Sequence, residues 1–170
     1  MSQIKSSLKT KILVESSLCI ALVLILSTIK LFRLPQGGSI TLEMLPLLVL
    51  SMRWGVKWGV LSGIVAGTLQ IAFGGFFVHP LQVLVDYPIA LGAIGLSGIW
   101  KNHLIAGSLF AGGVRLFCHV LSGVIFFAAY APPTENIWIY SFIYNLMFFL
   151  PSLLLSTLLA WLLIKKIKQK

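Results

Sequence analysis

A small set of polar side chains lies inside long apolar runs of this sequence, where a polar or ionisable group is costly and usually functional. Gln82 and Asp86 are four residues apart, as are Arg115 and His119, so each pair would share one face of a helix. A carboxylate accepts charge-assisted hydrogen bonds, and aromatic rings stack on a ligand or contact its cation. An acid among aromatic residues therefore suits a small cationic or amino-bearing aromatic ligand. The polar residues that could form such a site are Gln70, Gln82, Asp86, Tyr87, His119, Tyr140, Tyr144 and Asn145.

Several patterns of enzyme chemistry are absent from the sequence. It contains neither the GxxxxGK[ST] loop that binds ATP phosphates nor the HExxH pattern of zinc proteases. Asp86 is the only acid that falls well inside an apolar run, so it has no carboxylate partner for paired acid–base work. Cys19 and Cys118 lie in different runs and make a poor metal site. We therefore predict no catalytic residues, no metal site and no cofactor.

Composition defines the class of protein that must position these residues. Of 170 residues, 58% are hydrophobic and 10% are charged, and the mean hydropathy is +0.99. An ordinary soluble domain carries about 25% charged residues. The net charge of +9 comes from bases that flank apolar runs, so it indicates membrane topology and not a nucleic-acid partner. We predict an all-α polytopic membrane protein that forms a single domain over residues 1–170.

Six segments are candidates for membrane-spanning helices, each of which needs roughly 20 apolar residues. The second segment is the weakest, because it is short and is bounded by Glu43 and Arg53, so five spans remain an alternative. The segments are Leu13–Ile29, Thr41–Met52, Trp58–Phe73, His79–Trp100, Leu104–Ala129 and Asn136–Ile164.

The positions of Lys and Arg predict the orientation of the six spans. With the N-terminus inside, only Lys30 and Arg33 lie in outer segments, whereas the other flanking bases lie in inner ones, so both termini should be cytoplasmic. This topology places the polar residues named above in the outer half of the bilayer, where they would form a pocket open to the outside. The inner bases are Lys5, Lys9, Lys11, Arg53, Lys57, Lys101, Lys165, Lys166, Lys168 and Lys170.

Structural roles are the alternative for each of these residues. Asp86 could form a purely structural ion pair with Arg115, and His119 could donate to a backbone carbonyl. Tyr140 and Tyr144 could belong to an interfacial aromatic belt. Three glycines at helical spacing in the third span favour close helix packing over a cofactor loop; they are Gly59, Gly63 and Gly67.

A pair of small residues lies near the cytoplasmic end of the first span. Ser17 and Ala21 are four residues apart, a spacing that lets another helix approach closely in lipid. The approaching helix could belong to this chain or to a partner protein.

Four stretches of the sequence resemble one protein family. The chain is similar to the thiamine-specific substrate-binding (S) components of energy-coupling factor (ECF) vitamin transporters, the ThiT/YuaJ family. With the six-span layout, the resemblance covers nearly the whole chain. The stretches are GSITLEMLP (38–46), QVLVDYPIA (82–90), RLFCHVLSGVIFFAAYAP (115–132) and YSFIYN (140–145).

The resemblance implies a binding subunit of a bacterial plasma-membrane importer and not an enzyme. Such a subunit holds thiamine in an outward-facing pocket and docks on a transmembrane scaffold subunit that carries two ATPase subunits. By resemblance, Asp86 would contact the aminopyrimidine, the loop Gly37–Glu43 would help to close the site, and Ser17 and Ala21 would face the scaffold. The remaining pocket residues implied by the motifs are Tyr87, His119, Tyr140 and Asn145.

The chain departs from the family pattern at three positions. The family typically has glutamate at Asp86, a tryptophan at Phe127 and another tryptophan near Val65. Smaller aromatic surfaces would suit either thiamine or a related pyrimidine or thiazole precursor. Two other classes remain as alternatives: a free-standing small-cation/proton antiporter that uses Asp86 as its proton site, and a structural membrane subunit.

Overall fold

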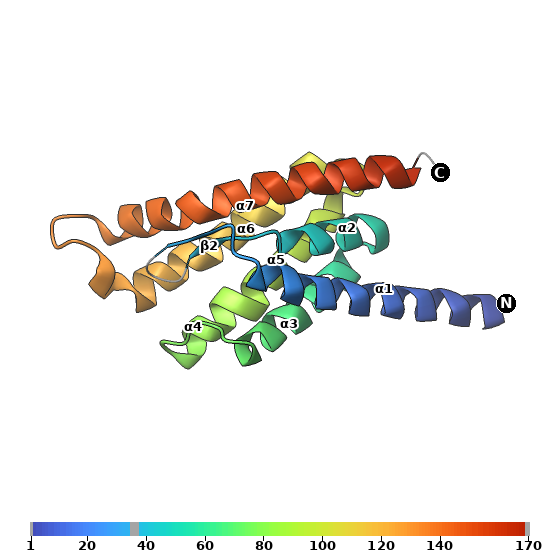
Figure 1. Ribbon diagram of the computed structural model, residues 1–170, viewed down its shortest axis with the longest axis horizontal. Helices are drawn as coiled ribbons and strands as arrows, with labels where there is room; N and C mark the ends of the chain where they lie inside the picture. Colours follow the sequence, from blue (N-terminus) through green and yellow to red (C-terminus); the bar gives the residue numbers. More distant parts are fainter. Residues whose placement is uncertain (1, 35–37, 169–170) are drawn as a thin grey trace.

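The computed structural model describes residues 2–34 and 38–168, with side chains for 7–34 and 38–166. Gly37 and Lys170, and the side chains of Lys5 and Lys168, therefore lie outside the described part of the chain. The fold is a bundle of helices with one small two-stranded sheet (Figure 1). The elements are α1 (Ser2–Thr28), β1 (Phe32–Arg33), β2 (Ser39–Ile40), α2 (Met44–Trp54), α3 (Val56–Ala72), α4 (Pro80–Leu84), the π-helix η1 (Val85–Ile89), α5 (Ala90–Ile94), the 3₁₀-helix η2 (Gly95–Trp100), α6 (Leu104–Phe126), the 3₁₀-helix η3 (Ala128–Tyr130) and α7 (Ile137–Lys168).

Four helical stretches in the described residues are long and apolar enough to cross a membrane: 7–28, 80–100, 104–126 and 137–166. The helices α2 and α3 are shorter, with 11 and 17 residues. At 1.5 Å per residue, α2 is only about 16 Å long and cannot cross a hydrocarbon core of about 30 Å by itself. The six predicted helical segments are therefore present, whereas the number of complete crossings stays a prediction.

The start of α1 and the end of α7 lie at the same end of the bundle (Figure 1, right). An even number of passes through the bundle produces this arrangement. The opposite end holds the connections between α3 and α4 and between α6 and α7.

The core lies around α2 and α5, which the longer helices surround. Leu47 and Leu48 of α2 and Leu91 and Ile94 of α5 are completely buried. A helix that is apolar on nearly all sides belongs in the interior of a bundle, and the first ten residues of α2, Met44–Arg53, contain a single charged residue, Arg53. The outer faces of α1, α6 and α7 instead present large apolar side chains such as Leu18, Phe117 and Leu154, as a lipid-facing surface requires.

The glycine face of α3 confirms the expectation of close helix packing. A Cβ atom on Gly59 would collide with Gly95 of η2, and one on Gly63 would collide with Leu91 and Gly92 of α5. A Cβ on Gly67 would meet the backbone of Tyr87 and Pro88 in η1. These glycines let α3 lie directly on the backbone of the neighbouring segment.

The fourth predicted span is not one regular helix. It passes through α4, the π-helix η1, α5 and the 3₁₀-helix η2. Pro88 lies inside η1 and has no N–H to donate to the carbonyl one turn before it, so a regular α-helix would lose a hydrogen bond there. π-Helical turns are rare and occur frequently at functional sites. This turn carries Asp86 and Tyr87.

We predict that Gly67→Ala destabilises the protein, because the new methyl group pushes against the Tyr87 carbonyl carbon and the Pro88 Cα. Overpacking of this kind costs about 1–3 kcal/mol. Gly113→Ala on α6 is the matched control, since a Cβ there meets no heavy atom within 4 Å. Thermal unfolding in detergent, followed by circular dichroism, should show a lower midpoint for Gly67→Ala only. Equal midpoints for the two variants would contradict close packing at Gly67.

Candidate ligand-binding site

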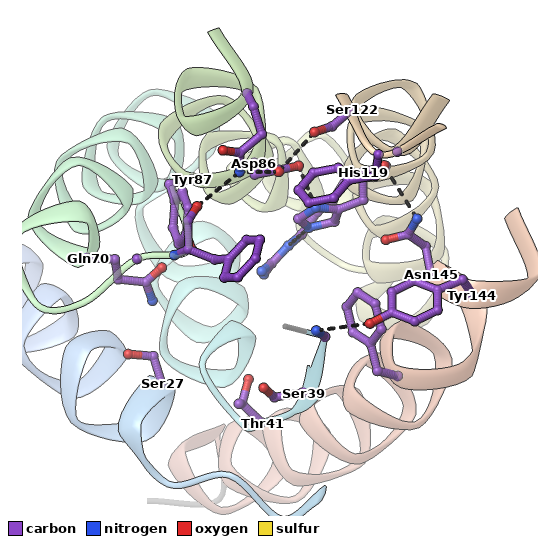
Figure 2. A pocket seen from close by; sticks show the side chains of 18 of the residues that line it. Ser27, Ser39, Thr41, Gln70, Asp86, Tyr87, His119, Ser122, Tyr144 and Asn145 are labelled. Carbon is purple, nitrogen blue, oxygen red and sulfur yellow. Dashed lines mark hydrogen bonds and ion pairs between the residues drawn. The ribbon is translucent and has the colours of Figure 1, made fainter. Parts of the chain in front are cut away.

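A cavity of about 340 Å³ lies between the end of α1, the β1–β2 hairpin, α3, η1, α6 and the first half of α7. Figure 2 shows the labelled polar side chains around this space. Phe127 also lines it, as do all the polar residues that the sequence placed at one depth: Gln70, Gln82, Asp86, Tyr87, His119, Tyr140, Tyr144 and Asn145. The structure therefore brings these side chains together around one cavity.

Asp86 is held by three neighbouring groups. Gln82 Nε2 donates to Oδ2 over 2.7 Å and Ser122 Oγ donates to the same oxygen over 2.9 Å. His119 Nδ1 lies 3.1 Å from Oδ1. Because the carboxylate is fixed from α4 and α6 at once, its position in the cavity is set before any ligand arrives.

Gln82 has a different role from the one that its sequence position indicated. Its side chain is only 1% exposed, so it offers a ligand almost no surface. Besides Asp86, Nε2 donates to the Phe76 carbonyl, and Oε1 accepts from Val78 N. Gln82 therefore ties the α3–α4 loop to the Asp86 carboxylate, as a positioning residue.

A second carboxylate, that of Glu43, lines the cavity, so Asp86 is not alone there. Arg115 Nη2 forms an ion pair with Glu43 Oε1, and Gln70 Nε2 donates to Glu43 Oε2 over 2.8 Å. The alternative pair between Asp86 and Arg115 is not formed, because Arg115 reaches Glu43 instead. The Nε atom of Arg115 lies 3.3 Å from His119 Nε2, which links the two acids through one chain of polar contacts.

One donor in this network has no acceptor. Within the described residues, Nη1 of Arg115 is buried without a hydrogen-bond partner, although Arg115 lines the cavity. A buried polar atom is normally satisfied, so this atom is an exception within the ion-pair network. The atom itself has almost no exposed surface, so a ligand in the cavity does not reach it without rearrangement of the side chain.

Aromatic rings form two walls of the cavity. Tyr140 and Tyr144 of α7 stack with centroids 6.3 Å apart, and Phe76 stacks on Phe127 at 6.0 Å. Tyr87 contributes its hydroxyl group, which accepts from Phe76 N. Such walls favour a flat aromatic ligand, which gains stacking and apolar contact.

Asn145 connects two helices at the edge of the cavity. Its Nδ2 donates to the Ser141 carbonyl over 2.8 Å and lies 3.4 Å from the His119 carbonyl of α6. Tyr140 and Asn145 differ by about 140° around an ideal helix, yet both line this space. The cavity is therefore wide enough to span that part of α7.

The β1–β2 hairpin covers the cavity from the side of α7. Gly38 N lies 3.4 Å from the Tyr144 hydroxyl, and Thr41 N donates to Ser152 Oγ over 3.2 Å. Gly38, Ser39, Thr41 and Glu43 line the cavity, so the described part of the loop that the resemblance assigned to closure does lie at the site.

Reasoning from the residues themselves treated Glu43 as the boundary of a span, and only the resemblance included it, as the last residue of the loop that closes the site. The available signal was Arg115, since a buried guanidinium needs an acid and the chain has only four acids. Val65, near which the family pattern has a tryptophan, is 45% exposed on α3 and does not line the cavity. This departure from the family pattern therefore does not change the cavity wall.

These features define a class: a polytopic helical membrane protein with a ligand cavity of fixed charges and aromatic walls. The described residues contain no group of three or more His, Cys, Asp or Glu side chains that could hold a metal ion.

The chain belongs to the family described as "Thiamine transporter protein (Thia_YuaJ)", whose model matches residues 13–170. It is thus a membrane transport protein of the bacterial plasma membrane with several apolar helices, and not an enzyme.

Individual relatives of the chain support its membership of this family. The thiamine transporter ThiT of Bacillus subtilis (strain 168) is 34% identical over 170 aligned residues, which cover 89% of this chain and 88% of that protein. ThiT of Lacticaseibacillus paracasei is 30% identical over 122 residues, or 60% of this chain and 61% of that protein.

Two solved structures are similar to the fold. ThiT from Listeria monocytogenes superposes with a TM-score of 0.84 at 26% identity, with 95% of this chain and 97% of that chain covered. The S component of a bacterial ECF transporter has a TM-score of 0.66 at 18% identity and the same two coverages, and this second likeness concerns the fold alone.

We predict that Arg115→Leu is strongly destabilising, because it leaves Glu43 as a buried charge with only Gln70 beside it. The side chains of Arg115 and Glu43 are 8% and 13% exposed, and removal of one partner from a buried pair costs about 3–5 kcal/mol. Adding Glu43→Gln to Arg115→Leu should restore much of the thermal stability.

The control for this prediction is Arg53→Leu, because the Arg53–Glu15 pair is 38% and 27% exposed and should contribute only about 0–1 kcal/mol. Thermal unfolding of the four proteins in detergent measures the comparison. If the double variant were no more stable than Arg115→Leu, the buried pair would not be the source of the loss.

Proposed function

We propose that this chain binds thiamine in the cavity and acts as the substrate-binding component of an ECF-type importer. The observation that carries the proposal is the Asp86 carboxylate, fixed by Gln82, His119 and Ser122 and placed among aromatic side chains. Family membership and the thiamine transporters among the relatives support the same ligand.

The functional groups of thiamine match those of the cavity. Its aminopyrimidine donates hydrogen bonds that suit the Asp86 carboxylate, and its two rings suit the walls formed by Phe127, Tyr140 and Tyr144. In this proposal Asp86, Tyr87, His119, Phe127, Tyr140, Tyr144 and Asn145 surround the ligand, and Gln82 positions Asp86.

The balance of charges supports a cationic ligand. The charged side chains of the cavity wall are the carboxylates of Glu43 and Asp86 and the guanidinium of Arg115, while Lys30 stands at the exposed rim. Glu43 is paired with Arg115, whereas no Lys or Arg among the described residues forms an ion pair with the Asp86 carboxylate. A thiazolium cation would neutralise it.

Replacement of the family's glutamate by Asp86 is compatible with this proposal. Aspartate is one methylene shorter, yet its carboxylate lies within hydrogen-bond distance of Ser122 and His119 on α6. The shorter side chain therefore still reaches its partners on α6 and presents a carboxylate at the cavity.

We predict that Asp86→Asn weakens thiamine binding by roughly 10- to 150-fold, because a hydrogen bond to a charged acceptor is worth about 1.5–3 kcal/mol. No tryptophan lines the cavity among the described residues, so isothermal titration calorimetry of the purified protein is the suitable measurement. Gly113→Ala serves as a control, since Gly113 lies outside the cavity.

Titrations with the separate pyrimidine and thiazole halves of thiamine distinguish the related ligands. Tighter binding of one half than of thiamine would assign the chain to that precursor. Weak binding of many unrelated cations, coupled to proton exchange, would instead support the antiporter that uses Asp86. Unchanged thiamine affinity in Asp86→Asn would remove Asp86 from the ligand site.

We further propose that Ser17 and Ala21 on α1 form the docking face for the ECF transmembrane scaffold subunit, which carries the two ATPase subunits. Both residues are exposed, whereas Ser16, Cys19 and Val23 on the other side of α1 are buried in the bundle. Small exposed residues four apart allow a second helix to approach closely. Internal packing of this chain uses the opposite face, which favours a partner protein here.

We predict that Ser17→Trp or Ala21→Trp abolishes thiamine uptake in cells, while the purified variant keeps its thiamine affinity. Leu154→Trp is the control, because Leu154 is 55% exposed on α7, away from this face. Co-purification should show loss of the scaffold and ATPase subunits from the α1 variants alone. Normal uptake by either α1 variant would place the docking face elsewhere.

A further inference from the structure

A second hollow lies at the other end of the bundle from the ligand cavity, where α1 starts and α7 ends. Its walls are the turn between η2 and α6, the first turns of α6 and the last turns of α7. The polar residues that line it are Lys101, Asn102, His103 and Lys165, and its apolar residues include Ile105, Leu109 and Trp161. None of these residues belongs to the ligand cavity.

The hollow carries positive charge without a compensating acid. The chain has four acids: Glu43 and Asp86 line the ligand cavity, Glu135 lies in the α6–α7 connection, and Glu15 pairs with Arg53 and Trp54. Lys101 and Lys165 form no ion pair with any described residue. An anionic group is therefore the complementary occupant.

The start of α6 adds further donors to the same place. Leu104, Ile105 and Ala106 form its first turn and all line the hollow. N–H groups in the first turn of a helix have no partner inside the helix and favour an anion. His103, which precedes the turn, makes no side-chain hydrogen bond that would cap it.

The rest of the hollow is apolar and continues onto the lipid-facing surface. Ile105 is 60% exposed and Leu109, one turn further along α6, is 55% exposed. Trp161 of α7 is 44% exposed, and Lys165 Nζ lies 5.2 Å from the centre of its ring. A tryptophan beside a lysine is typical of the membrane–water interface. The occupant must therefore have an anionic head and an apolar tail that lies along α6.

We propose that this hollow binds one anionic phospholipid of the cytoplasmic leaflet, with its phosphate between Lys101, Lys165 and the start of α6. An acyl chain lies against Ile105, Leu109 and Trp161. Basic pockets between membrane helices on the cytoplasmic side are known binding places for such headgroups. The site does not depend on which ligand the cavity at the other end binds.

The test compares two double variants that lose the same charge at the same end of the protein. Lys101→Gln with Lys165→Gln removes both lysines of the hollow, whereas Lys57→Gln with Lys166→Gln removes two exposed lysines that do not line it. Nonspecific electrostatic attraction to an anionic lipid should fall equally in both variants. Phosphatidylglycerol bound to the full chain in detergent is measured by native mass spectrometry, and circular dichroism verifies that each variant is folded.

We expect one phosphatidylglycerol molecule on the unmodified protein and on the Lys57/Lys166 variant. Binding to the Lys101/Lys165 variant should be roughly 30-fold weaker. Phosphatidylcholine should not replace it, and inorganic phosphate should not compete at concentrations comparable to those of the lipid.

Three outcomes would overturn the proposal. Equal loss in the two double variants would show diffuse attraction and no site. Equal retention in both would remove Lys101 and Lys165 from lipid binding. Efficient competition by inorganic phosphate would show that the hollow binds a free anion and not a lipid.

Discussion

The structure depends on one constraint: charges buried inside a membrane bundle must be paired. Arg115 is 7% exposed in the middle of α6, and Glu43 is the acid that pairs with it. This requirement fixes the point at which the chain leaves the β1–β2 hairpin and starts α2, because Glu43 immediately precedes that helix. The hairpin is thereby held over the cavity, and α2 is left as a short helix in the core. A buried carboxylate without its guanidinium would be far costlier than the pair.

An irregular stretch of backbone, the π-helix η1, then determines the position of the second carboxylate, that of Asp86. Pro88 prevents a regular helix through residues 85–89, and the π-turn that results carries Asp86 and Tyr87 toward the cavity. Gly67 allows α3 to press directly on the backbone of this turn. The conformation is thus supported from behind by close packing and from the front by the hydrogen bonds to Asp86. A site held from both sides requires little rearrangement to accept a ligand, which favours tight binding.

The two ends of the bundle have different chemistry. One end contains the aromatic cavity with Glu43 and Asp86, and the other contains an apolar hollow with two lysines that form no ion pair among the described residues. The small-residue face of α1 lies on the outer surface of the bundle, apart from both. Three separate surfaces are therefore available for the three proposed tasks of ligand capture, lipid contact and docking on a partner.

The sequence alone determined the class of protein, the six helical segments and the convergence of Asp86, His119, Tyr144 and Asn145. These follow from hydropathy, from charge placement and from helical spacing, which are properties of neighbouring residues. The tertiary structure decided which acid pairs with Arg115, that Gln82 positions Asp86 and contributes almost no surface of its own, and that Val65 lies outside the cavity. It also decided the π-turn at Pro88. Depth in the membrane is a one-dimensional quantity that the sequence carries, whereas rotation of a helix about its axis and pairing across segments depend on packing between residues distant in the chain.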